Sequence, residues 1–252
     1  MKAFLRALGW FVAVGALSVG LAAQTASAGR YDSAIQASVS KQLATKKEFH
    51  NVQAQVEDGI VTLTGSVDLY QQKLDAAKRI RKTGDLQGVR NLIAVNGKDV
   101  PDTDLTAQLD RELYYDRVGL DNVFNFMTAS VENGVATLGG EARNEADRDS
   151  ALSLVDNTAG VKDVVSNIKV APPSNFDDAI RIRTAQAIYH NPVLSRYAID
   201  PAHPIRIVVD RGQLSLYGMV GNAADKQIAG MLAGEVSGAF SVQNNLAVAN
   251  KS

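Results

Sequence analysis

The sequence contains few side chains that could perform catalysis or hold a metal ion. Its histidines are His50, His190 and His203, and none has a partner at the spacing of a metal site. Cysteine is absent, which excludes thiolate ligands, a disulfide framework and a lipidated cysteine. The chain also lacks the motifs of a serine-hydrolase elbow and of a phosphate-binding loop. We therefore expect exposed histidines and no catalytic residue, cofactor or metal ion.

Two clusters of charged residues suggest other chemistry. Asp99, Asp102 and Asp104 lie close together, but the glycine and distal glutamate of a calcium-binding loop are missing, so helix capping and solubility explain them better. Lys78, Arg79 and Lys82 lie on the outward side of a helix expected at about 69–82. Each could attract an anionic lipid headgroup by roughly 1 kcal/mol. An ordinary solvated helix face is the alternative.

The elements that position these residues follow a pattern that occurs three times. From Val52 to Val67, apolar residues alternate up to Asp58-Gly59 and again beyond it, which predicts a β-hairpin with a two-residue turn. The same pattern surrounds Asn133-Gly134 and Arg211-Gly212, at intervals of 75 and 78 residues. The predicted pairs are Val52–Gly65, Ala54–Leu63 and Val56–Val61; Met127–Gly140, Ala129–Leu138 and Val131–Ala136; and Ile205–Gly218, Ile207–Leu216 and Val209–Leu214.

Each hairpin lies between two helical patterns and is followed by a third strand, so the order is helix, strand, strand, helix, strand. The first helix is expected to begin with Asp32 as its N-cap, and repeat three to begin at Asp177. The predicted boundaries are 29–100 for repeat one, 101–172 for repeat two and 173–252 for repeat three. The second helices share Ala76, Ala151 and Ala229, and the second strands share Gly65, Gly140 and Gly218, which suggests close packing of this helix on the sheet.

Repeat three differs from the other copies in its apolar surface. On its second helix Ile228, Met231 and Leu232 point to the side that should face water, at i, i+3, i+4 spacing. On the outer face of its sheet Val208, Tyr217 and Met219 replace polar residues, with Arg206 opposite Tyr217. These six residues form a candidate lipid or partner surface. Packing against another repeat is the alternative.

The N-terminus predicts export. Residues 1–28 resemble a secretory signal peptide with Lys2 and Arg6, an apolar run, and a small-residue cleavage site before Gly29. The formal net charge is −1 for the whole chain and would be about −3 after cleavage, which is too nearly neutral for a nucleic-acid binder. We expect a periplasmic protein with no transmembrane segment in its mature chain.

The repeated Glu57-Asp-Gly-Ile-Val-Thr-Leu-Thr-Gly65 pattern, the helix alanine, and a strand such as Val164–Val170 resemble the BON domain, named for bacterial osmotically inducible periplasmic and nodulation proteins. The resemblance covers nearly the whole mature chain. It implies an α+β fold of three tandem αββαβ domains, each a three-stranded mixed sheet with two helices on one face. It also implies an envelope-associated binding module, often tied to phospholipid surfaces or osmotic stress, without catalytic residues.

Two functions remain open. The first is a non-catalytic periplasmic protein that acts at phospholipid or envelope surfaces in osmotic or envelope stress. The second is a structural adaptor whose repeats bind other envelope proteins. Salt-sensitive binding to anionic liposomes favours the first.

Overall fold

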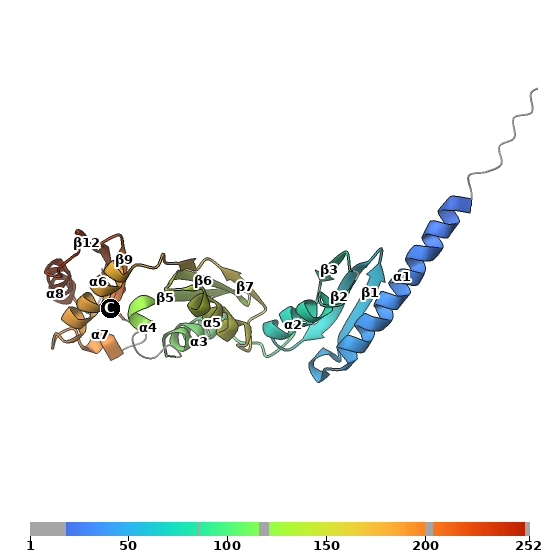
Figure 1. The fold of residues 1–252 in the computed structure, drawn as a ribbon. Helices are drawn as coiled ribbons and strands as arrows, with labels where there is room; N and C mark the ends of the chain where they lie inside the picture. The colour runs from blue at the N-terminus through green and yellow to red at the C-terminus, as the bar shows by residue number, and fades with distance from the viewer. Residues whose placement is uncertain (1–18, 85, 116–120, 200–203, 250–252) are drawn as a thin grey trace, which may run out of the picture. The chain divides into compact units, whose positions relative to one another are not determined.

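The computed structural model describes residues 19–84, 86–115, 121–199 and 204–249. The chain divides into two compact units, which are Met1–Gly65 with Ala76–Leu92, and Ser66–Asp75 with Ile93–Ser252. The elements of each unit can be followed by colour in Figure 1. Within the described residues the expected α+β fold with three αββαβ repeats is confirmed.

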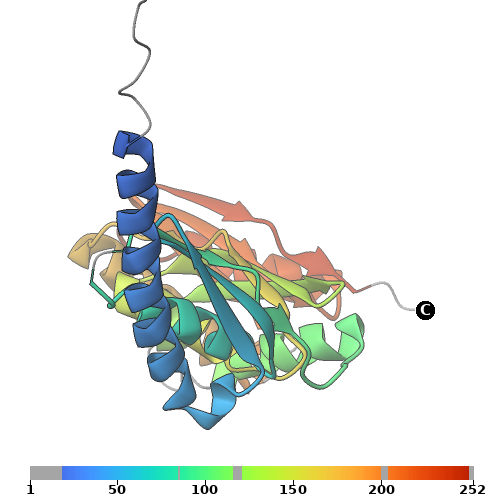
Figure 2. The same cartoon turned by 90° about the vertical axis from the view of Figure 1, so that its right-hand side faces the viewer.

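Repeat one consists of a long helix, a hairpin, a second helix and a third strand in two pieces. Its hairpin is antiparallel, and its third strand pairs in parallel with β2, so the sheet is mixed. Its elements are α1 (Val19–Ala44), the 3-10 helix η1 (Lys47–Phe49), β1 (Val52–Glu57), β2 (Ile60–Val67), α2 (Tyr70–Ile80), β3 (Gly88–Asn91) and β4 (Ala94–Val95). Figures 1 and 2 show α1 along the hairpin, with its N-terminal part continuing past the sheet.

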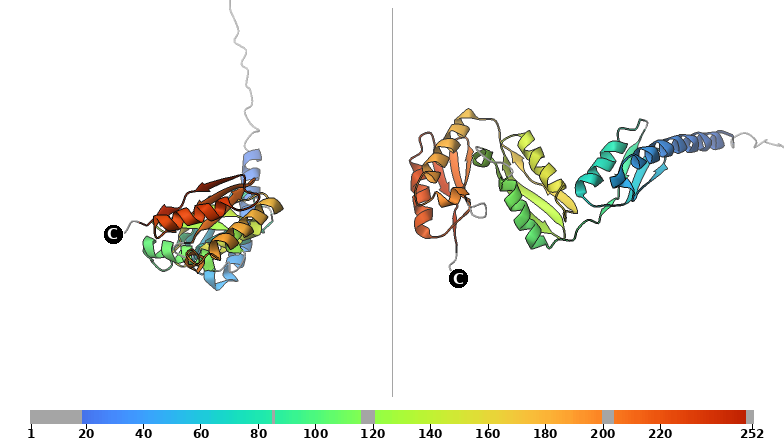
Figure 3. Two further views of the ribbon diagram at one scale, coloured as in Figure 1. Left: turned by 90° about the vertical axis from the view of Figure 1, so that its left-hand side faces the viewer. Right: turned by 90° about the horizontal axis from the view of Figure 1, so that it is seen from below.

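Repeats two and three have the same topology. In repeat two, α3 and α5 lie on the same face of the sheet, as Figure 3 shows from below. The elements of repeat two are α3 (Asp102–Tyr115), α4 (Asp121–Phe124), β5 (Phe126–Glu132), β6 (Val135–Ala142), α5 (Glu145–Asp156), β7 (Asp163–Ser166) and β8 (Lys169–Val170). Those of repeat three are α6 (Asn175–Tyr189), α7 (Arg196–Ile199), β9 (Arg206–Asp210), β10 (Gln213–Tyr217), β11 (Met219–Val220), α8 (Ala223–Gly234), β12 (Ser241–Asn244) and β13 (Ala247–Val248).

The predicted hairpin register is confirmed in all three repeats. Val56 pairs with Val61, Val131 with Ala136 and Val209 with Leu214. The first residue of each two-residue turn has a positive φ, 52° at Asp58, 55° at Asn133 and 48° at Arg211. Positive φ at both turn residues defines the type I′ turn, whose twist matches that of the strands. Arginine rarely adopts this conformation, so the turn of repeat three is held by contacts outside itself.

Those contacts come from an aspartate on the first helix of each repeat, and we call each arrangement a turn clamp. The carboxylate of Asp177 accepts the backbone N–H groups of Arg211 and Gly212 at 3.0 and 2.8 Å. Asp32 accepts those of Asp58 and Gly59 at 2.9 and 2.8 Å, and Asp102 accepts those of Asn133 and Gly134 at 2.6 and 2.9 Å. Each clamp therefore ties the first helix to the hairpin through two charge-assisted hydrogen bonds.

The expected N-cap role of Asp32 is wrong, because α1 begins at Val19 and runs through Asp32 without a break. The side chain is free for the turn clamp because the helix supplies its own backbone partners at this position. The helix also continues through the Ala28–Gly29 bond where signal cleavage is expected, whereas residues 1–18 lie outside the described residues. No helix within the described ranges has the length and apolar character needed to cross a membrane.

The glycines shared by the second strands are not explained by close packing of the second helix, which the sequence suggests. Gly65 and Gly140 have φ of 102° and 101°, and a Cβ on Gly140 would lie 1.8 Å from the carbonyl oxygen of Phe126. Glycine is therefore required at this position by its positive φ and by the close approach of the first-strand backbone, and not by the second helix. The helix alanines Ala76, Ala151 and Ala229 are nevertheless fully buried in the cores of their repeats.

The first strand of each hairpin lies at the edge of its sheet. Side chains of the first helix form hydrogen bonds with some of the backbone groups exposed at this edge. Gln36 donates to the carbonyl oxygen of Ala54 at 2.8 Å in repeat one. In repeat two Asp110 accepts the N–H of Ala129 at 3.0 Å. These contacts occupy backbone groups that an additional strand would use, which disfavours pairing with an extended peptide at this edge.

Candidate functional site

The junction between repeats two and three includes part of the predicted partner surface. Tyr217 stacks on Phe126 of repeat two, with ring centroids 5.7 Å apart. The guanidinium of Arg206 lies 4.9 Å from the Tyr114 ring centroid and 5.9 Å from that of Phe126, and burial lowers the pKa of Arg206. Arg206 and Tyr217 are paired across the hairpin as the sequence predicts. The structure thus places Tyr217 against another repeat, and Val208 is half-buried beside it on the same strand face.

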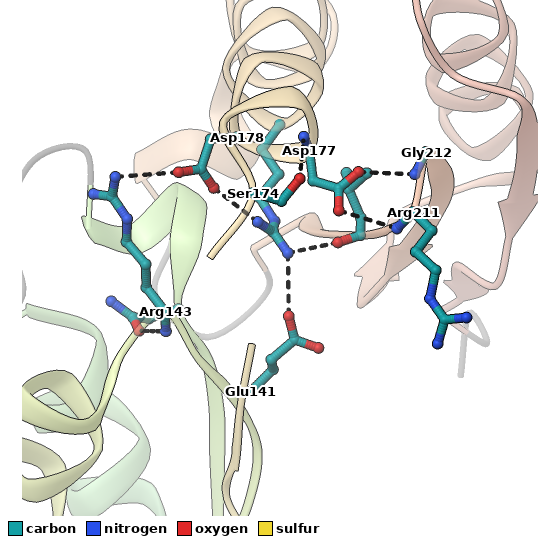
Figure 4. Close-up of polar contacts among 10 residues, drawn as sticks. Glu141, Arg143, Ser174, Asp177, Asp178, Arg211 and Gly212 are labelled. Carbon is teal, nitrogen blue, oxygen red and sulfur yellow. Dashed lines mark hydrogen bonds and ion pairs between the residues drawn. The ribbon is translucent and has the colours of Figure 1, made fainter. Parts of the chain in front are cut away.

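Ion pairs complete this junction, as Figure 4 shows. Arg181 is only 4% exposed and donates to Asp178 at 2.9 Å, to Glu141 of repeat two at 3.2 Å and to the carbonyl oxygen of Val209 at 2.6 Å. Arg143 of repeat two reaches Asp178 at 3.2 Å. Burial raises the pKa of Glu141, while the positive charge of Arg181 opposes that rise. This part of the chain serves docking of the two repeats.

A pocket of about 400 Å³ lies beside α7 and the start of α8, lined in part by Met219. Two of its lining residues, Arg196 and Tyr197, contact the buried carboxylate of Asp225, which is paired with Arg196 and accepts a hydrogen bond from the hydroxyl of Tyr197. Burial acts to raise the pKa of Asp225, but these two partners outweigh it and lower the pKa overall. Tyr197 in turn accepts the N–H of Gly221 at 2.8 Å. These polar groups already satisfy one another, so the pocket is a structural feature of repeat three.

The outward face of α8 carries no charge. The exposed positions of this fully described helix are Ala223, Ala224, Gln227, Met231 and Gly234. Met231 is 59% exposed, whereas Ile228 and Leu232 are half-buried and pack against the core of repeat three. Of the three residues that the sequence singles out on this helix, only Met231 points fully to solvent. The equivalent helices α2 and α5 both have exposed charged residues.

The predicted headgroup-binding residues lie at one end of repeat one, which we call the basic end. Lys78 and Lys82 are exposed, and Arg79 donates from Nη2 to the hydroxyl of Thr45 at 2.9 Å. This contact joins the C-terminal ends of α1 and α2. Immediately after Thr45 come Lys46 and Lys47, which are also exposed. Helix C-termini favour cations, so this clustering also complements the dipoles of both helices.

A groove of about 870 Å³ adjoins the basic end. Its lining includes the apolar residues Leu43, Phe49 and Val52, together with Lys46 and Lys47. The buried Nε of Arg79 has no hydrogen-bond partner among the described residues. Apolar walls beside clustered cations can accommodate an amphiphile with an anionic headgroup. Lys46 and Lys47 are not among the headgroup-binding residues predicted from the sequence, although two adjacent lysines at the end of a helical pattern are a visible signal.

The histidines give no sign of a reaction centre. His50 and His190 are exposed, and His203 lies outside the described residues. The ring Nδ1 of His50 is 2.8 Å from the carbonyl oxygen of Lys47. Within the described ranges, no group of three or more histidine or acidic side chains could hold a metal ion.

The family model of the BON domain matches residues 31–97, 101–172 and 193–250, which is most of the chain. The chain belongs to the BON-domain family. In the third copy the match begins at residue 193, after the end of α6. α6 nevertheless packs in the core of repeat three, and its Asp177 contacts the hairpin turn as Asp32 and Asp102 do in the other repeats.

Other similarities of this BON-domain protein are more distant. It is 28% identical over 145 residues to the "Uncharacterized protein in gshII 5'region" of Anaplasma centrale, covering 55% of this chain and 94% of that protein. It also resembles the C-terminal domain of CdsD, a structural protein of the type III secretion system of Chlamydia trachomatis, at 10% identity. That match covers 84% of this chain and 96% of the CdsD chain with a TM-score of 0.25. The periplasmic domain of PrgH from S. typhimurium gives 9% identity and a TM-score of 0.19, covering 84% of this chain and all of that one. At these TM-scores neither structure supports a conclusion about this chain.

Proposed function

We propose that this BON-domain protein is an exported, non-catalytic periplasmic protein that binds anionic phospholipid surfaces through the basic end of repeat one. The observation that carries the proposal is the convergence of α1 and α2, which brings Lys46, Lys47, Lys78 and Lys82 together around the Arg79–Thr45 contact. A single basic helix face would be ordinary, but here two separate segments add their charges beside an apolar groove.

The expected strength of this attraction follows from the number of exposed cations. Each contributes roughly 1 kcal/mol near an anionic membrane surface, so the four lysines supply about 4 kcal/mol at low salt. Export fits this function because signal cleavage after Ala28 leaves Asp32 and the rest of repeat one on the mature chain. A role in osmotic or envelope stress is also part of the proposal, and membership of the BON-domain family supports it.

Co-sedimentation of the mature protein with vesicles tests the proposal. Binding should require phosphatidylglycerol in the vesicles, and should weaken between 50 and 200 mM salt by about tenfold or more because the charges are exposed. Reversing Lys46, Lys78 and Lys82 to glutamate should abolish it. The matched control reverses Lys98, Lys162 and Lys169, exposed lysines of the other compact unit, and changes the net charge equally. Equal loss in both variants would show that only net charge matters and would contradict a site in repeat one.

A second candidate function is an adaptor that binds another envelope protein through α8. The observation that favours it is the uncharged outer face of this helix around Met231. Met231→Lys would then abolish capture of a partner while leaving vesicle binding unchanged. If vesicle binding is lost in Met231→Lys and retained in the Lys46, Lys78 and Lys82 variant, the lipid site is on α8 and the basic end is only a solvated surface.

A further inference from the structure

Repeat three exposes two phenylalanines beside its hairpin turn, one on α6 and one immediately before β12. Phe240 is 76% exposed and Phe176 is 46% exposed, and their ring centroids are 5.7 Å apart. Both rings lie over Gly212, where an added Cβ would be 2.6 Å from Cδ2 of Phe240 and 3.2 Å from Cε1 of Phe176. We call this pair with its turn the aromatic tip. Two large apolar rings held side by side in solvent are uncommon on the surface of a soluble domain.

The other repeats show that the fold does not need an aromatic residue at this place. In each repeat the residue before the third strand donates its backbone N–H to the carbonyl oxygen of the turn glycine. The three residues are Gln87 at 2.9 Å, Lys162 at 2.8 Å and Phe240 at 2.8 Å. Because glutamine and lysine occupy the same position in repeats one and two, this backbone contact does not require an aromatic side chain.

Cationic side chains flank the aromatic tip. An added Cβ on Gly238 would lie 3.3 Å from Nη2 of Arg183 and 3.6 Å from Cε2 of Phe176, so Arg183 is next to the ring. Arg211 belongs to the turn itself, and its side chain is 89% exposed with a 3.5 Å ion pair to Asp210. The nearby carboxylate of Asp177 is already occupied by the turn clamp. The tip therefore combines apolar rings with guanidinium groups at their edge.

We propose that the aromatic tip inserts Phe176 and Phe240 into the interfacial region of an anionic phospholipid bilayer, with Arg183 and Arg211 at the level of the headgroups. Transfer of a phenyl ring from water to the acyl boundary of a bilayer is favourable, and an arginine side chain beside it can keep its charge at the level of the phosphates. The two rings, one on α6 and one immediately before β12, lie beside the hairpin turn and are exposed, so a deformable bilayer can receive them. This inference rests on the proposed function and adds a second, apolar contact to the electrostatic one in repeat one.

The test uses the double variant Phe176→Ser and Phe240→Gln, which gives the second position the residue of repeat one. Partition onto vesicles of phosphatidylglycerol and phosphatidylcholine should weaken by about tenfold or more, because burial of two aromatic side chains is lost. The melting temperature should be unchanged, since both side chains are exposed in the folded protein. Val165→Gln, which removes an exposed apolar residue from β7 of repeat two, is the control and should bind as the wild type does.

Each other outcome has a defined meaning. Failure of the wild-type protein to bind any vesicle would overturn the proposed function together with this inference. Normal vesicle binding by the double variant would overturn the inference alone. If the double variant binds vesicles normally but no longer self-associates in sedimentation velocity, the rings contact a second copy of the chain, which also contradicts insertion into lipid.

Discussion

The turn clamp of repeat three gives the sharpest prediction about stability. Asp177 is 6% exposed, and both turn N–H groups depend on its carboxylate. A hydrogen bond to a charged group contributes roughly 1.5–3 kcal/mol, and a buried donor left without a partner is costly. Asp177→Ala should therefore lower the free energy of unfolding of repeat three by about 3 kcal/mol.

The other two clamps provide an internal comparison. Asp32 and Asp102 are half-exposed, and so water can replace the lost carboxylate at their turns. Alanine at either position should cost only about 1 kcal/mol. Asp104→Ala is the control, because Asp104 is an exposed acid in the first turn of α3 and clamps no turn; its cost should stay below about 0.5 kcal/mol.

Urea unfolding followed by circular dichroism, combined with hydrogen exchange of the peptide that contains Arg211 and Gly212, measures these effects. Exchange at this turn should accelerate in Asp177→Ala, while the turn of repeat two keeps its wild-type rate. Asp177 does not hold the turn in this way if Asp177→Ala is no less stable than Asp32→Ala, or if exchange at the turn of repeat three does not change.

Three further predictions concern other parts of the fold. Gly140→Ala should destabilise repeat two by on the order of 3 kcal/mol in thermal or urea unfolding, because the added Cβ would clash with the carbonyl oxygen of Phe126. Gly139→Ala is the control and should be nearly neutral, because its added Cβ would contact only Thr128 Oγ1, at 3.5 Å. The lowered pKa of Asp225 means that its stabilising contribution is complete above the unfolded pKa of about 4 and is lost as pH falls through the folded pKa. The melting-temperature difference between wild type and Asp225→Asn should therefore shrink as pH is lowered from 7 to 3, and a constant difference would contradict this assignment. Arg206→Ala should loosen the junction of repeats two and three, seen as faster hydrogen exchange around Tyr114 and Phe126 with the hairpin of repeat three unchanged.

The sequence predicts the repeat and the hairpin register because both depend on local signals. Alternating apolar residues and an Asp-Gly or Asn-Gly turn permit only one register that buries the apolar face. The same pattern gives the correct register for repeat three, although its turn is Arg-Gly. The turn clamps are not predictable in this way. An aspartate near a helix start has the composition of an N-cap, and only the tertiary structure shows that Asp32 faces a turn 26 residues later.

The candidate site is predicted in part. Lys78, Arg79 and Lys82 are recognisable from helical spacing, but Lys46 and Lys47 come from the segment that follows α1 and lie near them only in the folded chain. The outer sheet face of repeat three is recognisably apolar, yet a pattern within one repeat cannot show that Tyr217 stacks on Phe126 of another. The sequence alone does not distinguish Phe240 from other apolar residues of a strand of mixed polarity. Its position becomes informative only when it is compared with the equivalent residues Gln87 and Lys162 of the other repeats.

Hydrogen exchange of the mature protein with and without vesicles containing phosphatidylglycerol tests the central claim most directly, because it reports where the lipid contact lies. If the basic end binds lipid, peptides that cover its two segments, residues 40–50 and 78–84, should exchange more slowly with vesicles, and this protection should be lost at high salt. Protection confined to residues 223–236 of repeat three, with the basic end unchanged, would contradict lipid binding by the basic end.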